Sequence, residues 1–187
     1  HIWDEWADEN GSIGKAYGYQ LGVRHQYKEG MMDQVDRVLY DLKNNPYSRR
    51  IMTNIYVHQD LHEMNLYPCA YSMTFNVTGN KLNAILNQRS NDILTANNWN
   101  VVQYAVLVHM IAQVSGLEAG ELVHVIADAH IYDRHIPLVK ELIKRQTYDA
   151  PVFRMNPDVK DFYEFTVDDF ELEDYKYGPQ IKIPVAV

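Results

Sequence analysis

The sequence predicts a single domain of the α+β class spanning residues 1–187. Segments with helical and strand periodicity are mixed along the chain without a regular strand–helix–strand alternation. The length of 187 residues fits one domain, and a hydrophobic fraction of 47% is ordinary for a globular protein. No internal repeat, low-complexity segment or linker divides the sequence.

The chain begins with an aromatic helical turn. Trp3 and Trp6 are three residues apart and flanked by acidic residues, which indicates one turn of helix with an aromatic face. Core packing is the simpler role for Trp6. A glycine-rich stretch ends this turn, and Tyr17 and Tyr19 are expected in a loop.

The next elements are one helix and one strand. An apolar stripe predicts a helix over residues 33–45, which its first residue, an aspartate, can cap and the following proline ends. The β-rich residues 51–57 predict a strand. Arg49 and Arg50 stand at its entrance, where such a pair is usually solvated unless a partner surface places it near an anion.

A β-hairpin is predicted in the middle of the chain. Residues 71–77 and 82–87 are its arms, and residues 78–81 have the composition of a turn. Cys69 stands just before the first arm and Arg89 just after the second. The hairpin is therefore expected to place both residues at the same end of a sheet.

The second half of the chain contains the clearest helix pattern. Apolar residues at three-four spacing predict a helix over residues 100–117, apolar on most sides and therefore buried in the core. Residues 122–127 predict a buried strand that runs on to residue 132. Further expected elements are a helix at 137–145 and strands at 151–155 and 170–175.

Composition weighs against several classes of function. The net charge of −8 argues against nonspecific nucleic-acid binding, which needs a basic surface. No apolar run reaches the roughly 18 residues that span a membrane, and the first residues do not resemble a targeting peptide. A single cysteine cannot form an internal disulfide, which suits a reducing compartment such as the cytoplasm.

Residues 68–100 carry the candidate chemistry. They contain Cys69, a potential nucleophile, and Arg89, a potential anion-binding group. They also contain Asn100, whose amide could recognise a ligand through hydrogen bonds. A lone cysteine between apolar strands is more often a small core residue, so that alternative stays open.

Two further alternatives concern metals and binding proteins. No cysteine accompanies the histidines of the second half and their spacing matches no compact zinc motif, so we predict no metal site from His124, His130 and His135. A binding protein such as an RNA-binding regulator is the rival to an enzyme, and the acidic charge weighs against such a regulator.

The chain resembles thymidylate synthase along essentially its whole length. Segments 2–11, 48–50, 68–69, 88–92, 128–132 and 184–187 carry the resemblance by their order and spacing. It implies a homodimer whose large mixed β-sheets, with flanking helices, pack back to back. It also implies reductive methylation of dUMP to dTMP, with 5,10-methylenetetrahydrofolate supplying the carbon and the hydride.

The resemblance assigns roles to individual residues. Cys69 would add to C6 of uracil, Arg89 beside it would favour the thiolate, and Tyr17 would assist proton removal through ordered water. Asn100 would accept from N3–H and donate to O4 of uracil. The other dUMP contacts would be Gln88, Arg89, Ser90, Asn91, Asp92, His130 and Tyr132, with Arg49 and Arg50 contributed to the other subunit's site. The folate contacts would be Trp3, Asp92, Ala186 and Val187, the last two in a closing tail.

Three departures from the family pattern raise alternatives. Ala70 stands where the family usually has a histidine, and residues 95–99 lack the usual glycine and proline–phenylalanine pair. The family's N-terminal part, with a phosphate-loop arginine and a catalytic glutamate, is not in the sequence. A molecule that truly began at His1 is expected to be inactive or severely weakened. The alternatives are therefore a hydroxymethylase-type relative acting on dCMP or dUMP, and an inactive nucleotide-binding fragment.

Overall fold

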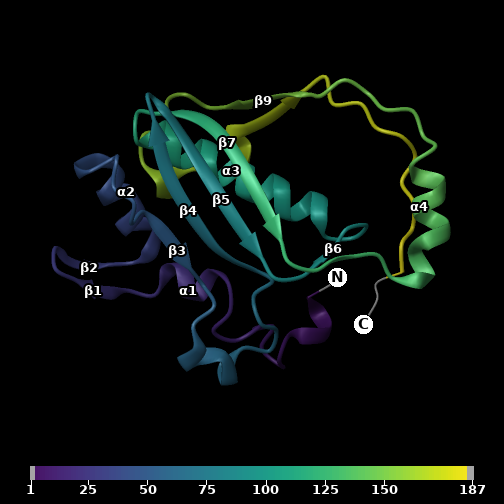
Figure 1. Ribbon diagram of the computed structural model, residues 1–187, viewed down its shortest axis with the longest axis horizontal. Coiled ribbons are helices and arrows are strands. Elements are labelled where there is room, and N and C mark those ends of the chain that lie inside the picture. Colours follow the sequence, from purple (N-terminus) through teal and green to yellow (C-terminus); the bar gives the residue numbers. More distant parts are fainter. Residues whose placement is uncertain (1–2, 185–187) are drawn as a thin grey trace.

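A four-stranded mixed sheet forms the centre of the fold. The structure, a computed structural model, describes residues 3–184. Helix α3 (Asn97–Val114) connects the parallel strands β5 and β7 and lies along one face of the sheet (Figure 1). This arrangement confirms the α+β class. The strands run in the order β3 (Met52–Asn54), β4 (Ala70–Thr78), β5 (Lys81–Gln88) and β7 (Glu118–Ile126), and the first three are antiparallel.

The central hairpin is confirmed. β4 and β5 pair from Thr78 and Lys81 outward, and Gly79 at the turn has φ +61°, which glycine adopts without strain. At the other end of the hairpin the backbone N–H of Arg89 donates to the carbonyl of Cys69 at 2.9 Å. The two residues therefore meet at one end of the sheet, as predicted.

The core lies between the sheet and α3. Buried residues on α3 pack against alternate residues of β4 and β5, and α2 (Gln34–Asn44) closes one side. The Asp33 side chain accepts from the backbone N–H of Asp36 at 2.8 Å and caps α2, as predicted. The main members of the core are Val38, Leu42, Met73, Phe75, Leu82, Leu86, Tyr104, Val108 and Ile111.

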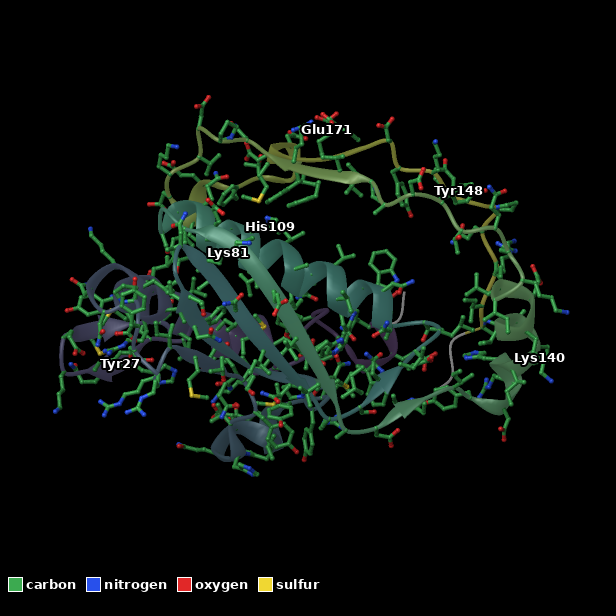
Figure 2. All side chains as sticks on the ribbon, turned by 45° about the horizontal axis from the view of Figure 1, so that its top comes forward. Tyr27, Lys81, His109, Lys140, Tyr148 and Glu171 are labelled. Atoms are coloured by element: carbon green, nitrogen blue, oxygen red, sulfur yellow. The ribbon has the colours of Figure 1, made fainter. Side chains whose placement is uncertain are left out.

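Helix α3 differs from its prediction in start and in burial. It begins at Asn97 rather than at residue 100, so residues 97–99 belong to its first turn. It is apolar on most sides, but only the face toward the sheet is buried, and Val102 is 60% exposed. The outer face of its C-terminal half is contacted by the chain after α4, where the rings of His109 and Phe153 lie 5.1 Å apart (Figure 2).

Residues 122–126 lie in a strand, as predicted, but the prediction that this strand is buried was wrong. No residue of β7 is buried, and its side chains alternate between the two faces of the sheet. On the face away from α3, one row crosses the sheet through Met52, Thr74, Ile85 and Val123, with Val125 beside it. We call these five residues the open face, because its four apolar members are 37–49% exposed.

The strand predicted to run to residue 132 is broken. β7 ends at Ile126, and the chain then forms the two-residue strand β8 (Ala129–His130). β8 pairs in parallel with β6 (Asn91–Asp92), so that Asp92 is opposite His130. This separate pairing joins the polar segment after β5 to the segment after β7.

The chain after β8 forms a long arch outside α3. It contains α4 (Ile136–Leu142) and the antiparallel strands β9 (Val152–Met155) and β10 (Phe170–Glu173) (Figure 1). The returning chain runs beside the outgoing chain, since Arg145 Nη1 donates to the Pro179 carbonyl at 2.5 Å. Lys140 and Tyr148 mark this arch in Figure 2.

Several short elements before β4 were not predicted. The Tyr17–Tyr19 loop is mostly helix α1, and two three-residue strands precede α2, because such short elements have too few residues to show a period. The predicted strand 51–57 is reduced to β3. The unpredicted elements are α1 (Gly18–Gly22), β1 (His25–Tyr27), β2 (Gly30–Met32) and the 3-10 helix η2 (His58–Glu63), whereas the 3-10 helix η1 (Asp4–Trp6) confirms the predicted aromatic turn. After β4 the chain also forms the 3-10 helices η3 (Asp133–His135), η4 (Phe162–Glu164) and η5 (Val167–Asp169).

Core packing against β5 predicts a large stability effect. Leu86 is fully buried, so Leu86→Ala should lower the free energy of unfolding by about 2–5 kcal/mol. Leu172→Ala is the matched control, because Leu172 is 50% exposed on β10 and should lose much less. Urea unfolding followed by circular dichroism measures both, and equal shifts of the two midpoints would contradict this description of the core.

Candidate active site

The site is centred on Cys69 and the guanidinium of Arg89. Arg89 Nε donates to the Pro68 carbonyl at 3.0 Å, and Nη2 donates to the Tyr67 carbonyl at 2.9 Å. These bonds fix the guanidinium beside Cys69, with Nη2 3.8 Å from Sγ. The half-buried thiol therefore has a permanent positive charge within hydrogen-bonding reach. Cys69 is therefore not fully enclosed in the hydrophobic core.

Tyr17 completes the surroundings of Cys69. Its hydroxyl accepts from the backbone N–H of Cys69 at 3.0 Å. Burial, followed by the electrostatic interaction with Cys69, raises the pKa of Tyr17 well above its ordinary value. Tyr17 has φ 46° and ψ −106°, and a tyrosine in this left-handed region is strained, as residues at functional sites often are. The phenol keeps its proton at neutral pH and can orient a water but not act as a free base.

A polar chain leads from β7 to the start of α3. His124 Nε2 lies 2.8 Å from Gln88 Oε1, and Gln88 Nε2 donates to Asn100 Oδ1 at 2.9 Å. Gln88 Nε2 also donates to the Ser90 carbonyl at 2.8 Å. Gln88 and Asn100 are thus brought together as a unit. The contact of His124 with Gln88 was not predicted from the sequence, because a strand pattern does not show which residue of the neighbouring strand a side chain will contact.

The pairing of β6 with β8 gathers a second group of predicted residues. The Asp92 carboxylate accepts from the backbone N–H groups of Leu94 and Thr95 and from the Thr95 hydroxyl, so it closes the turn that leads into α3. Opposite it, His130 Nδ1 lies 3.1 Å from Asp128 Oδ1, and its ring meets the edge of Tyr132 at 5.2 Å.

Asn91 is buried, and its Nδ2 donates to Asn97 Oδ1 at 3.0 Å. Its side chain holds the start of α3 and is almost completely buried. The strand that was predicted to reach Tyr132 ends at His130, yet the rings of these two residues still make contact.

The C-terminal segment is held to this region by His135. This fully buried side chain lies with Nε2 2.8 Å from the Pro184 carbonyl, and its ring meets Tyr132 at 5.8 Å. The tail is thereby anchored up to residue 184. Ala186 and Val187, the predicted folate contacts, lie outside the described residues.

A cavity of about 610 Å³ opens beside Asn100. Trp3 on one side and Trp99 on α3 form aromatic walls, and the Trp3 ring meets the edge of Tyr17 at 5.3 Å. Trp3, one wall of this cavity, therefore lies next to the tyrosine that contacts Cys69. Trp6, expected in the core, is 38% exposed instead, because no larger element covers its turn.

Arg49 and Arg50 are not brought into the site of their own chain. Both are exposed after α2 and just before β3. Within residues 3–184, neither side chain forms an ion pair or a hydrogen bond with the groups around Cys69. Arg89 itself lines a second cavity of about 360 Å³, together with Asn54, Tyr56, His58 and Tyr71.

Two features are absent from residues 3–184. No group of three or more histidine, cysteine or acidic side chains is placed to hold a metal ion. No helix in this part of the chain combines the length and apolar character needed to cross a membrane.

Comparison with known proteins gives one consistent family. The family model described as thymidylate synthase matches residues 1–187. A thymidylate synthase from Bacillus licheniformis is 49% identical over 188 residues, and one from Bacillus phage phi3T is 48% identical; each match covers 100% of this chain and 67% of the relative. A solved structure of the thermostable thymidylate synthase A from Bacillus subtilis has a TM-score of 0.95 and 47% identity, covering 100% of this chain and 68% of that one.

The position of Arg89 predicts the reactivity of the thiol. Arg89→Leu removes the charge that attracts a thiolate, so alkylation of Cys69 by iodoacetamide at pH 7 should slow several-fold. Arg154→Leu is the matched control, because Arg154 pairs with Glu173 on the arch. Mass spectrometry of the alkylated cysteine gives both rates. Equal rates for Arg89→Leu and wild type would contradict the electrostatic role.

Proposed function

Because this chain belongs to the thymidylate synthase family, which methylates dUMP to dTMP, we infer that Cys69, Arg89 and Tyr17 are the catalytic residues of that reaction. The observation that carries this proposal is the thiol of Cys69, which lies beside the fixed guanidinium of Arg89 and whose backbone N–H is bound by Tyr17.

The first step is addition of the Cys69 thiolate to uracil. A bond forms between Sγ and C6, the C5–C6 double bond breaks, and its electron pair moves through C4 onto O4. The positive charge of Arg89 supports the thiolate that begins this step. An N–H of Asn100 directed at O4 would stabilise the developing negative charge there.

The substrate carries a proton on C5 that must leave before the product forms. Tyr17 remains protonated, so its role is to orient the water that takes this proton. Methylenetetrahydrofolate, when bound, supplies the one-carbon unit and the hydride and leaves as dihydrofolate. The aromatic walls at Trp3 and Trp99 fit a flat ring of this kind beside Asn100.

The remaining contacts follow the two polar groups of the site. Arg89 and Ser90 would bind the substrate phosphate, and His130 and Tyr132 the sugar hydroxyl. Gln88 and Asn91 would support the base and the start of α3. Asp92 would reach the nucleotide or the folate only by exchanging bonds with Thr95. Ala186 and Val187 remain proposed folate contacts in a tail that excludes water.

The open face is proposed to bind a second copy of this chain. Half-exposed apolar residues on a sheet face are costly in water, and a two-fold partner with the same face would cover them. Arg49 and Arg50 lie three and two residues before Met52 of this face. In such a dimer they would reach the phosphate site of the partner. Their lack of contact with the groups around Cys69 of their own chain supports this proposal.

We further propose that residues 1–187 act as one domain and that the protein works in the cytoplasm. One continuous cluster of buried residues, which includes members of α2, α3 and the sheet, supports the first proposal. The single free cysteine, which would survive best in a reducing compartment, supports the second.

Substitution of the nucleophile tests the reaction. Cys69→Ser should lower the rate of dTMP formation by at least about 100-fold, because a serine hydroxyl is far less ionised than a thiol. Binding of dUMP, measured by calorimetry, should change little, since the variant differs by one atom. Turnover that survived in Cys69→Ser would overturn the assignment of Cys69.

Subunit mixing tests the shared site. Cys69→Ser and the double variant Arg49→Ala/Arg50→Ala should each be nearly inactive alone. When they are unfolded together and refolded, half of the dimers are mixed and each has one intact site, so activity should recover to about a quarter of wild type. If the arginines served their own chain, no mixed dimer would have an intact site and activity would stay low.

A further inference from the structure

The amide of Gln88 is held on three sides. It is 2% exposed, and its partners are the His124 ring, the Asn100 side chain and the Ser90 carbonyl. An amide this deeply buried cannot exchange a lost partner for water. Its orientation is therefore set entirely by these groups.

The direction of each bond follows from one fixed acceptor. The Ser90 carbonyl can only accept, so the nitrogen of the Gln88 amide faces it and the oxygen faces His124. That oxygen also can only accept, so His124 carries its proton on Nε2. Asn100 then turns Oδ1 toward Gln88 and has its own N–H groups left for another acceptor.

We propose that His124 is a specificity-positioning residue, which holds Gln88 so that Asn100 presents an N–H to O4 of uracil and cannot present its oxygen. This inference rests on the proposed function. Cytosine carries an amino group in place of O4 and needs an acceptor at this point. Asn100 could provide one only by flipping its amide, which would bring two N–H groups together at Gln88.

His124 reaches this position through the parallel pairing of β5 and β7. Leu86 is its register partner, and Gln88 is the next residue of β5 on the same face. Burial lowers the pKa of His124, so at neutral pH the ring donates a hydrogen bond without adding a charge near the base. A tryptophan, asparagine or glutamine could donate here, whereas an aliphatic residue could not.

Calorimetric binding of dUMP and dCMP tests the proposal in the full-length protein. Wild type should bind dUMP more tightly, and His124→Leu should reduce the ratio of the two affinities about tenfold, because Gln88 Oε1 loses its donor. His124→Gln supplies an amide donor and should keep the ratio within about threefold. His62→Leu is the matched control on an exposed side chain, and Asn100→Asp shows that the assay detects a change of preference.

Each outcome separates the inference from the proposed function. A wild-type ratio retained in His124→Leu, or equal losses for both nucleotides, would overturn the role of His124 while the proposed function stands. Wild-type protein that bound neither nucleotide would overturn both. Nitrogen-15 NMR of histidine-labelled wild type gives a readout free of nucleotide. His124 should be protonated on Nε2, and protonation on Nδ1 alone would contradict the bond directions.

Discussion

The position of the Arg89 guanidinium is the constraint on which the rest of the site depends. Its bonds to the carbonyls of Tyr67 and Pro68 use backbone that directly precedes Cys69. The charge and the thiol are therefore parts of one rigid junction, which the hairpin of β4 and β5 closes by its last backbone bond. An arginine that was not held by these bonds would lose side-chain entropy each time its guanidinium approached the thiol.

The other parts of the site are connected to this junction by backbone pairing. β5 continues from the hairpin into Gln88, and β7 brings His124 to it from a distant part of the sequence. β6 and β8 then place Asp92 opposite His130. Because sheet pairing determines these positions, the polar groups are held with little freedom of their own, which is what recognition of a base requires.

The two faces of the sheet differ in how far they are covered. The face toward α3 forms the core and ends in the polar chain of His124, Gln88 and Asn100. The open face has apolar residues where a monomer would be expected to have polar ones. The proposed second copy of this chain would cover this face and bring its Arg49 and Arg50 to the phosphate site. One proposal would thus explain both the incomplete burial and the incomplete site.

The sequence by itself determined the elements with long, clear periods and the residue types of the chemistry. The helix capped by Asp33, the hairpin, the helix containing Tyr104 and the meeting of Cys69 with Arg89 all followed from local pattern and turn composition. Only the tertiary structure decided which faces are covered. Val102 and Val123 look like core residues in any local pattern, yet they are exposed, because burial depends on elements that pack from elsewhere in the chain. The role of His124 was hidden for the same reason, since its partner is 36 residues away and is chosen by strand register.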